Sequence, residues 1–145
     1  MKSIQLIVGG EFDPDVLLAQ LGMAASKTWR RGERRCDGQP ITGSSGFVLQ
    51  IDDDGSQTLA EQCHRACQFL MTHRNTILTI RAFPGVKTAE VQILMSVEFV
   101  RRIVSWSPGF SAELVRVAGE CGLSLSFVVE IALGPGYAPA GPSPQ

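Results

Sequence analysis

The sequence predicts one α+β domain, built as a ferredoxin-like two-layer sandwich with a mostly antiparallel sheet of about five strands and helices on one face. Three observations lead to this class. Strand-like alternation and helical periodicity take turns along 145 residues, a length that suits one domain. The expected helices begin at recognisable capping residues. Residues 12–17 and 110–115 share a pattern of phenylalanine, cap, acid and apolar residue, which indicates two related β-α units.

The first β-α unit opens the chain. A strand is expected at residues 4–8, where every second residue is apolar. A helix follows, because the carboxylate of Asp13 can accept an unpaired amide of the first turn and Pro14 suits the first helical position. Gly22 can end this helix.

The next elements are a strand and a helix. Residues 23–46 show no periodicity and are expected to be irregular, whereas residues 47–51 alternate as a strand does. Thr58 and Glu61 form a capping-box pattern at the start of the second helix. The sequence therefore predicts a return from the sheet to the helical layer here.

The remainder of the chain predicts three more strands and one more helix. The segment "TILTIRAF" at residues 76–83 is expected to be the third strand and residues 91–99 the fourth. Residues 100–106 fit either a strand or a helical turn. Ser111 is the expected cap of the last helix. Residues 123–131 show the cleanest alternation and are the fifth strand.

The end of the chain differs in composition. Residues 135–145 are rich in proline and glycine, and such a segment is expected to be a disordered tail. The predicted domain therefore spans residues 1–134.

Charge and composition narrow the function. The formal net charge is −1, so no overall field attracts nucleic acid or a membrane surface. The start of the chain lacks the long apolar run of a secretory signal, and no segment has the roughly 20 apolar residues of a membrane span. The four cysteines do not form a disulfide framework. We therefore expect a cytoplasmic protein that binds no nucleic acid and no membrane.

One short segment is strongly basic. Between Lys27 and Asp37 the sequence has five bases against two acids. Arginine and tryptophan are common in binding hot spots, and arginine binds carboxylates and phosphates through two hydrogen bonds. The candidate partner-binding residues are Trp29, Arg30, Arg31, Arg34 and Arg35. In the alternative interpretation, Trp29 packs on the sheet and the arginines are solvated or paired with acids such as Asp13, Asp15 or residues 52–54. The family motif favours this structural role for Trp29 and Arg30, and it leaves surface recognition to Arg31, Arg34 and Arg35.

Metal binding and catalysis have weaker support. Cys63 and Cys67 lie on the apolar stripe of a helix, and His64 points away from it, so buried cysteines explain this group better than a metal site does. Cys36 follows two arginines that could lower the pKa of its thiol. No base or orienting partner stands beside it in the sequence, as a nucleophile requires. We expect no metal, no cofactor and no enzymatic activity.

The motifs together resemble a known family. Phe12-Asp13-Pro14, the sequence Thr28-Trp29-Arg30-Arg31-Gly32 and Phe110-Ser111-Ala112-Glu113-Leu114 resemble the pattern of the small bacterial family named domain of unknown function 4279. The resemblance covers nearly all of the chain except the tail. It implies a compact α+β domain and carries over no catalytic residue. The arginines after Gly32 depart from the family pattern.

These observations favour a non-catalytic protein-binding domain. By analogy with small bacterial domains that accompany toxin genes, its most specific form is an immunity protein that neutralises a cognate toxin. The alternative is a small-molecule or anion-binding regulatory domain that uses the same arginines. A third interpretation, an enzyme that uses Cys36, has the least support. The sequence leaves a monomer and a homodimer open.

Overall fold

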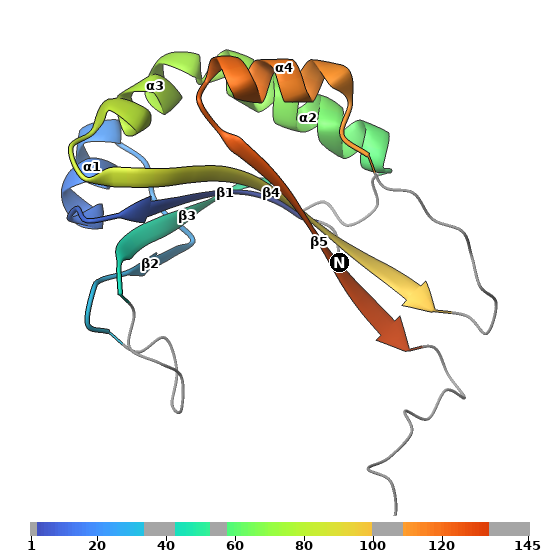
Figure 1. The fold of residues 1–145 in the computed structure, drawn as a ribbon, viewed down its shortest axis with the longest axis horizontal. Coiled ribbons are helices and arrows are strands. Elements are labelled where there is room, and N and C mark those ends of the chain that lie inside the picture. Colours follow the sequence, from blue (N-terminus) through green and yellow to red (C-terminus); the bar gives the residue numbers. More distant parts are fainter. Residues whose placement is uncertain (1–2, 34–42, 53–57, 100–108, 134–145) are drawn as a thin grey trace, which may run out of the picture.

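A computed structural model describes residues 3–33, 43–52, 58–99 and 109–133 of the protein. It contains a five-stranded sheet and four helices (Figure 1). In chain order the elements are β1 (Ser3–Gly10), α1 (Pro14–Leu21), β2 (Lys27–Trp29), β3 (Ser45–Asp52), α2 (Leu59–Thr72), α3 (Arg74–Ala82), β4 (Val86–Phe99), α4 (Ala112–Glu120) and β5 (Ser124–Leu133).

The sheet is mixed but mostly antiparallel. Its strand order is β2-β3-β1-β4-β5, and only the β4–β5 pair is parallel. A parallel neighbour requires a crossover connection, which α4 supplies between β4 and β5. The α+β class and the mostly antiparallel sheet are confirmed, and the ferredoxin-like arrangement stays a prediction.

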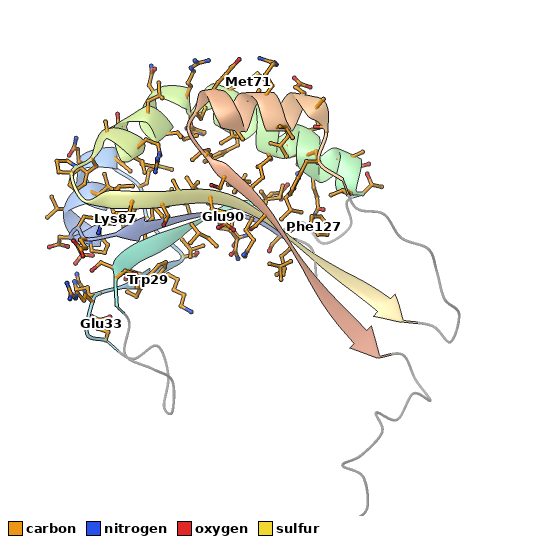
Figure 2. All side chains as sticks on the ribbon, in the orientation of Figure 1. Trp29, Glu33, Met71, Lys87, Glu90 and Phe127 are labelled. Carbon is orange, nitrogen blue, oxygen red and sulfur yellow. The ribbon has the colours of Figure 1, made fainter. Side chains whose placement is uncertain are left out.

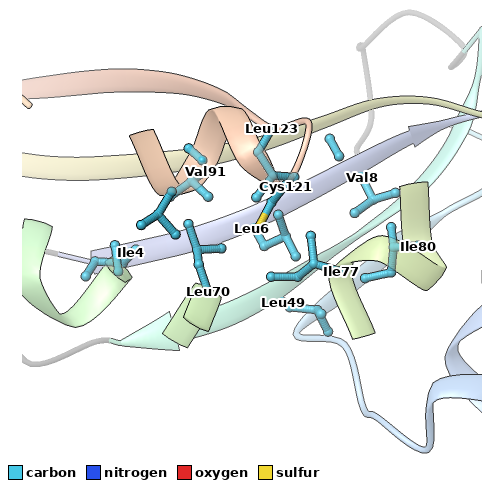
Figure 3. Packing of buried hydrophobic residues seen from close by; sticks show 14 of the residues in the cluster. Ile4, Leu6, Val8, Leu49, Leu70, Ile77, Ile80, Val91, Cys121 and Leu123 are labelled. Carbon is cyan, nitrogen blue, oxygen red and sulfur yellow. The ribbon is translucent and has the colours of Figure 1, made fainter. Parts of the chain in front are cut away.

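All four helices pack on one face of the sheet, where they enclose the core (Figures 1 and 3). The central strand β1 contributes Ile4, Leu6 and Val8 to this core, and each is at most 1% exposed. Their alternation with Gln5 and Ile7 gives β1 its two faces. We call the other side of the sheet the open face, because no described helix lies against it.

The predicted helix starts are confirmed. The carboxylate of Asp13 accepts the amide of Asp15 at 3.0 Å, and Ser111 Oγ accepts the amide of Leu114 at 3.2 Å. Thr58 and Glu61 form a complete capping box at the start of α2. These caps satisfy amides that a helix leaves unpaired, which fixes where each helix begins.

The prediction of a strand at residues 76–83 was wrong. This segment belongs to α3, in which Ile77 and Ile80 are buried one helical turn apart. Its β-branched residues favour a strand by local preference, but burial of this two-residue stripe against the sheet outweighs that preference. Thr79 shows one local compensation, since its hydroxyl donates to the carbonyl of Asn75 at 2.9 Å.

The predicted irregular segment contains a strand that the sequence did not indicate. β2 spans Lys27–Trp29 and pairs with β3. The predicted count of five strands agrees with the structure only because the missed strand, β2, offsets the strand wrongly predicted at residues 76–83. Residues 100–106, the tail at 135–145, and Cys36 lie outside the described residues.

None of the helices in the described ranges is both long enough and apolar enough to cross a membrane.

Candidate partner-binding site

The most specific motif of the sequence, Thr28-Trp29-Arg30-Arg31-Gly32, forms the end of β2 and the turn that follows it. Trp29 is the last residue of β2, and its Cα register partner is Gly46 of β3. Phe47, the neighbour of Gly46, lies in the core. Since successive strand residues point to opposite faces, Trp29 lies on the open face (Figure 2).

Trp29 is an anchor in this structure. Trp29 is only 6% exposed to solvent although it lies in the edge strand β2. A Cβ atom built on Gly46 would overlap both the indole ring of Trp29 and the carbonyl oxygen of Val8. Only glycine therefore lets the ring approach the backbone of β3 this closely.

The turn after Trp29 explains the glycine of the motif. The amide of Glu33 donates to the carbonyl of Arg30 at 3.1 Å, which closes a four-residue turn. Gly32 is the third residue of this turn and has a φ of 91°, a conformation that side chains disfavour. The amide of Arg31 donates to Ser45 Oγ at 3.0 Å, so the turn is also fixed to the start of β3.

The side chain of Arg30 returns to the start of α1. Its guanidinium contacts the carboxylate of Asp15, and it lies 4.0 Å from a carboxylate oxygen of Asp13 and 3.8 Å from one of Glu33. The side chain is 45% exposed, so these pairs are partly screened by solvent. Arg30 thus connects the β2 turn to the acidic N-terminus of α1.

Arg31 points outward but also has an acidic neighbour. Its side chain is 71% exposed and lies 3.9 Å from the carboxylate of Glu11. Lys87 lies 3.5 Å from the same carboxylate. Glu11 therefore stands between cations from the β2 turn and from the start of β4.

In the folded protein, acids from outside the basic segment balance the positive charge of its described part. Around the turn, four carboxylates face three cations. The carboxylates belong to Glu11, Asp13, Asp15 and Glu33, and the cations to Arg30, Arg31 and Lys87. Glu11, Asp13 and Asp15 precede the basic segment in the chain. A count of charges within the segment therefore did not include them.

The structure thus separates the five candidate residues. Trp29 is buried, Arg30 is half-exposed within an acidic cluster, and Arg31 is exposed. Arg34 and Arg35 lie outside the described residues. The turn that carries Arg30 and Arg31 lies at the β2 edge of the sheet, and we call this edge the rim of the open face.

The open face itself carries a row of amide side chains that the sequence analysis did not single out. Gln50, Gln5 and Gln92 are successive register partners across β3, β1 and β4, and Ser126 of β5 continues the row. Gln5 Nε2 donates to Gln50 Oε1 at 3.5 Å. The signal was present in the sequence as the polar positions of each alternating strand.

Apolar side chains and few charges surround this row. Ile7 and Leu94 are half-buried, and Val128 is 37% exposed. Glu90 contacts the hydroxyl of Ser126, and Lys27 lies at the β2 edge. The described open face is therefore close to neutral and mixes hydrogen-bonding with apolar groups.

The described cysteines have no features of a nucleophile. Cys63, Cys67 and Cys121 are buried in the core, as the helical stripe predicted for the first two. Burial raises the pKa of the Cys67 thiol, and it does the same for the pKa of Cys121. A raised pKa keeps a thiol protonated and unreactive.

Other sites on the described chain are sparse. No group of three or more His, Cys, Asp or Glu residues suited to a metal ion occurs within the described ranges. A shallow, open depression of about 340 Å³ lies on the outer side of α2, lined by Glu61, His64, Arg65 and neighbours. Its lining comes from one helix, which gives a ligand little to close around.

Fold and surface together define a small two-layer α+β domain in which the described helices cover one face of the sheet. The chain belongs to the family described as domain of unknown function (DUF4279), whose model matches residues 4–131. This confirms the resemblance that the Phe-Asp-Pro and Thr-Trp-Arg motifs indicated. No curated protein and no solved structure matches the chain.

Proposed function

We propose that this protein is a non-catalytic protein-binding domain, and in its most specific form an immunity protein that neutralises a cognate bacterial toxin. The observation that supports binding is the open face of the sheet. The helices of the described ranges lie on the opposite side (Figure 1), and the open face mixes amide and apolar side chains as protein interfaces do.

The basic segment has a secondary part in this proposal. Trp29 and Arg30 hold the rim in place, because the first is buried and the second joins the acidic cluster. Arg31, together with Arg34 and Arg35, would steer an acidic partner toward the neighbouring open face. Exposed charges at the rim of an interface change association rates more than they change affinity.

The proposal also covers the location of the protein, the partners it does not bind and the arrangement of its fold. The protein acts in the cytoplasm, binds neither nucleic acid nor membranes, and has a ferredoxin-like arrangement of its β-α units.

The alternative function, an anion-binding regulatory domain, requires arginines that are available to a ligand. The carboxylates around Arg30 and Arg31 weigh against that alternative for these two residues.

The test is co-expression with the gene adjacent to its own. Protection of growth from the adjacent product, together with a stable complex on gel filtration, would support the proposal. A melting temperature that rises with a small metabolite, without any protein complex, would favour the anion-binding alternative.

Substitutions then locate the surface within such a complex. Gln92→Glu introduces a negative charge on the open face, which an acidic partner would oppose, and should weaken binding at least about tenfold. The control Gln20→Glu makes the same change on the exposed surface of α1 and should leave affinity unchanged. Reversing Arg31, Arg34 and Arg35 to glutamate should slow association and reduce its dependence on salt. Equal affinities for all variants would reject the assigned surface.

A further inference from the structure

The two edges of the sheet differ in length and in what lies beside them. β2 forms one edge with three residues, and β5 forms the other with ten. Within the described residues β5 pairs with β4 only. Its outward backbone groups are therefore a long template for another strand.

The ends of β4 and β5 extend past the rest of the sheet (Figure 1). The pairing of β4 with β1 ends where Ser3 stands opposite Leu94. The pairing with β5 continues from Met95 opposite Val129 to Phe99 opposite Leu133. These five pairs form a two-stranded parallel ribbon. A two-stranded ribbon is marginal alone, and parallel pairing is slightly less stable than antiparallel pairing, so a third strand would stabilise it.

Apart from the charge of Glu130, β5 lacks the features that protect an edge strand. Ser124–Val128 contains no charge and no proline, and the register with β4 is free of bulges. Leu125 and Phe127 are only partly buried, and Val128 is 37% exposed on the other side. Natural edge strands normally carry a lysine, a proline or a bulge to prevent pairing.

We propose that β5 pairs antiparallel with β5 of a second copy of this chain, so that two sheets join into one continuous sheet of ten strands. The strand is chemically suited to itself. With the two-fold axis at Val128, Ser126 stands opposite residue 130 of the other copy. Residue 130 is Glu, the single charged residue of β5, so this register places no like charges opposite each other.

The chain's own C-terminal sequence is a poor substitute for the second copy. The twelve residues that follow Leu133 include four prolines. Proline has no backbone N–H to donate, so a segment with this composition cannot supply a regular ladder. A second β5 offers ten residues without proline.

The experiment is sedimentation velocity of the full chain over a concentration series. We expect a monomer–dimer equilibrium that Val128→Lys weakens at least about tenfold, because two lysines would face each other at the axis. The control Val115→Lys makes the same change on α4, where Val115 is 52% exposed, and should dimerise as the original protein does.

Three results would overturn the proposal. The first is a monomer at every concentration. The second is a dimer that both lysine variants weaken equally, which would place the interface elsewhere. The third is a monomer whose β5 amides become protected from hydrogen exchange only when a different protein, the product of the adjacent gene, is bound. That result would assign the edge to the other protein. Circular dichroism of Val128→Lys checks that the variant folds.

Discussion

The β2 corner and the β5 edge are opposite ends of one sheet, and their contacts differ. At the β2 corner the distinctive residues contact the protein itself: Trp29 covers Gly46, and Arg30 joins the acidic cluster at α1. At the β5 edge, ordinary strand residues such as Leu125 and Val128 remain partly exposed.

The contrast teaches that a distinctive motif need not be the binding site. Tryptophan and arginine are typical of interfaces, yet Trp29 and Arg30 stabilise a short strand that has little pairing of its own. The surfaces that we propose for partners, the open face and the β5 edge, consist mainly of glutamine, serine and aliphatic residues. The following substitutions test this difference, beginning with the largest expected effect.

Replacing Trp29 should affect stability most. Trp29→Ala removes a nearly buried ring from the contact with Gly46 and should lower the free energy of unfolding by about 3 kcal/mol. Urea denaturation measures the change, and Trp29→Phe should recover part of it. If Trp29→Ala were as stable as the original and lost only partner binding, Trp29 would belong to the interface instead.

Replacing Gly32 should have a smaller effect. Gly32→Ala places a side chain at a φ of 91° and should cost about 1 kcal/mol of stability. Gly43→Ala is the matched control, because a Cβ there meets no atom within 4 Å, and should be neutral or slightly stabilising. Equal stability of the two variants would show that the turn does not require glycine.

The pair of Arg30 and Asp15 should have the smallest effect. Both side chains are substantially exposed, so a double-mutant cycle with Arg30→Ala and Asp15→Ala should give a coupling of about 0.5 kcal/mol that decreases with added salt. Asp15→Ala alone also removes an acid from the first turn of α1. Zero coupling at low salt would mean that Arg30 does not connect the turn to α1.

Much of the fold could be predicted because its signals are local. Asp13, Thr58 and Ser111 each cap a helix within a few residues of the chain, and alternation marks the long strands. α3 was mistaken for a strand because two residues, Ile77 and Ile80, give a weaker helical pattern in the sequence than the run of β-branched residues gives for a strand. Their burial against the sheet, which favours the helix, is a contact that local patterns do not show.

The rest depends on contacts between distant parts of the chain. β2 has three residues and no periodicity, and its position depends on the contact between Trp29 and Gly46. The charge of the basic segment could not be judged alone, because Glu11 and Asp15 approach it only in the folded protein. The amide row on the open face likewise requires the strand order, which local patterns do not give.

The most direct test of the contrast is amide hydrogen exchange at two protein concentrations, followed residue by residue. In an edge strand every second amide points away from its neighbour and is left unpaired. The account predicts that the fast-exchanging amides of Ser124–Leu133 become protected as concentration rises, while those of Lys27–Trp29 do not change. Protection that appears at Lys27–Trp29, or β5 amides that exchange equally fast at both concentrations, would contradict it.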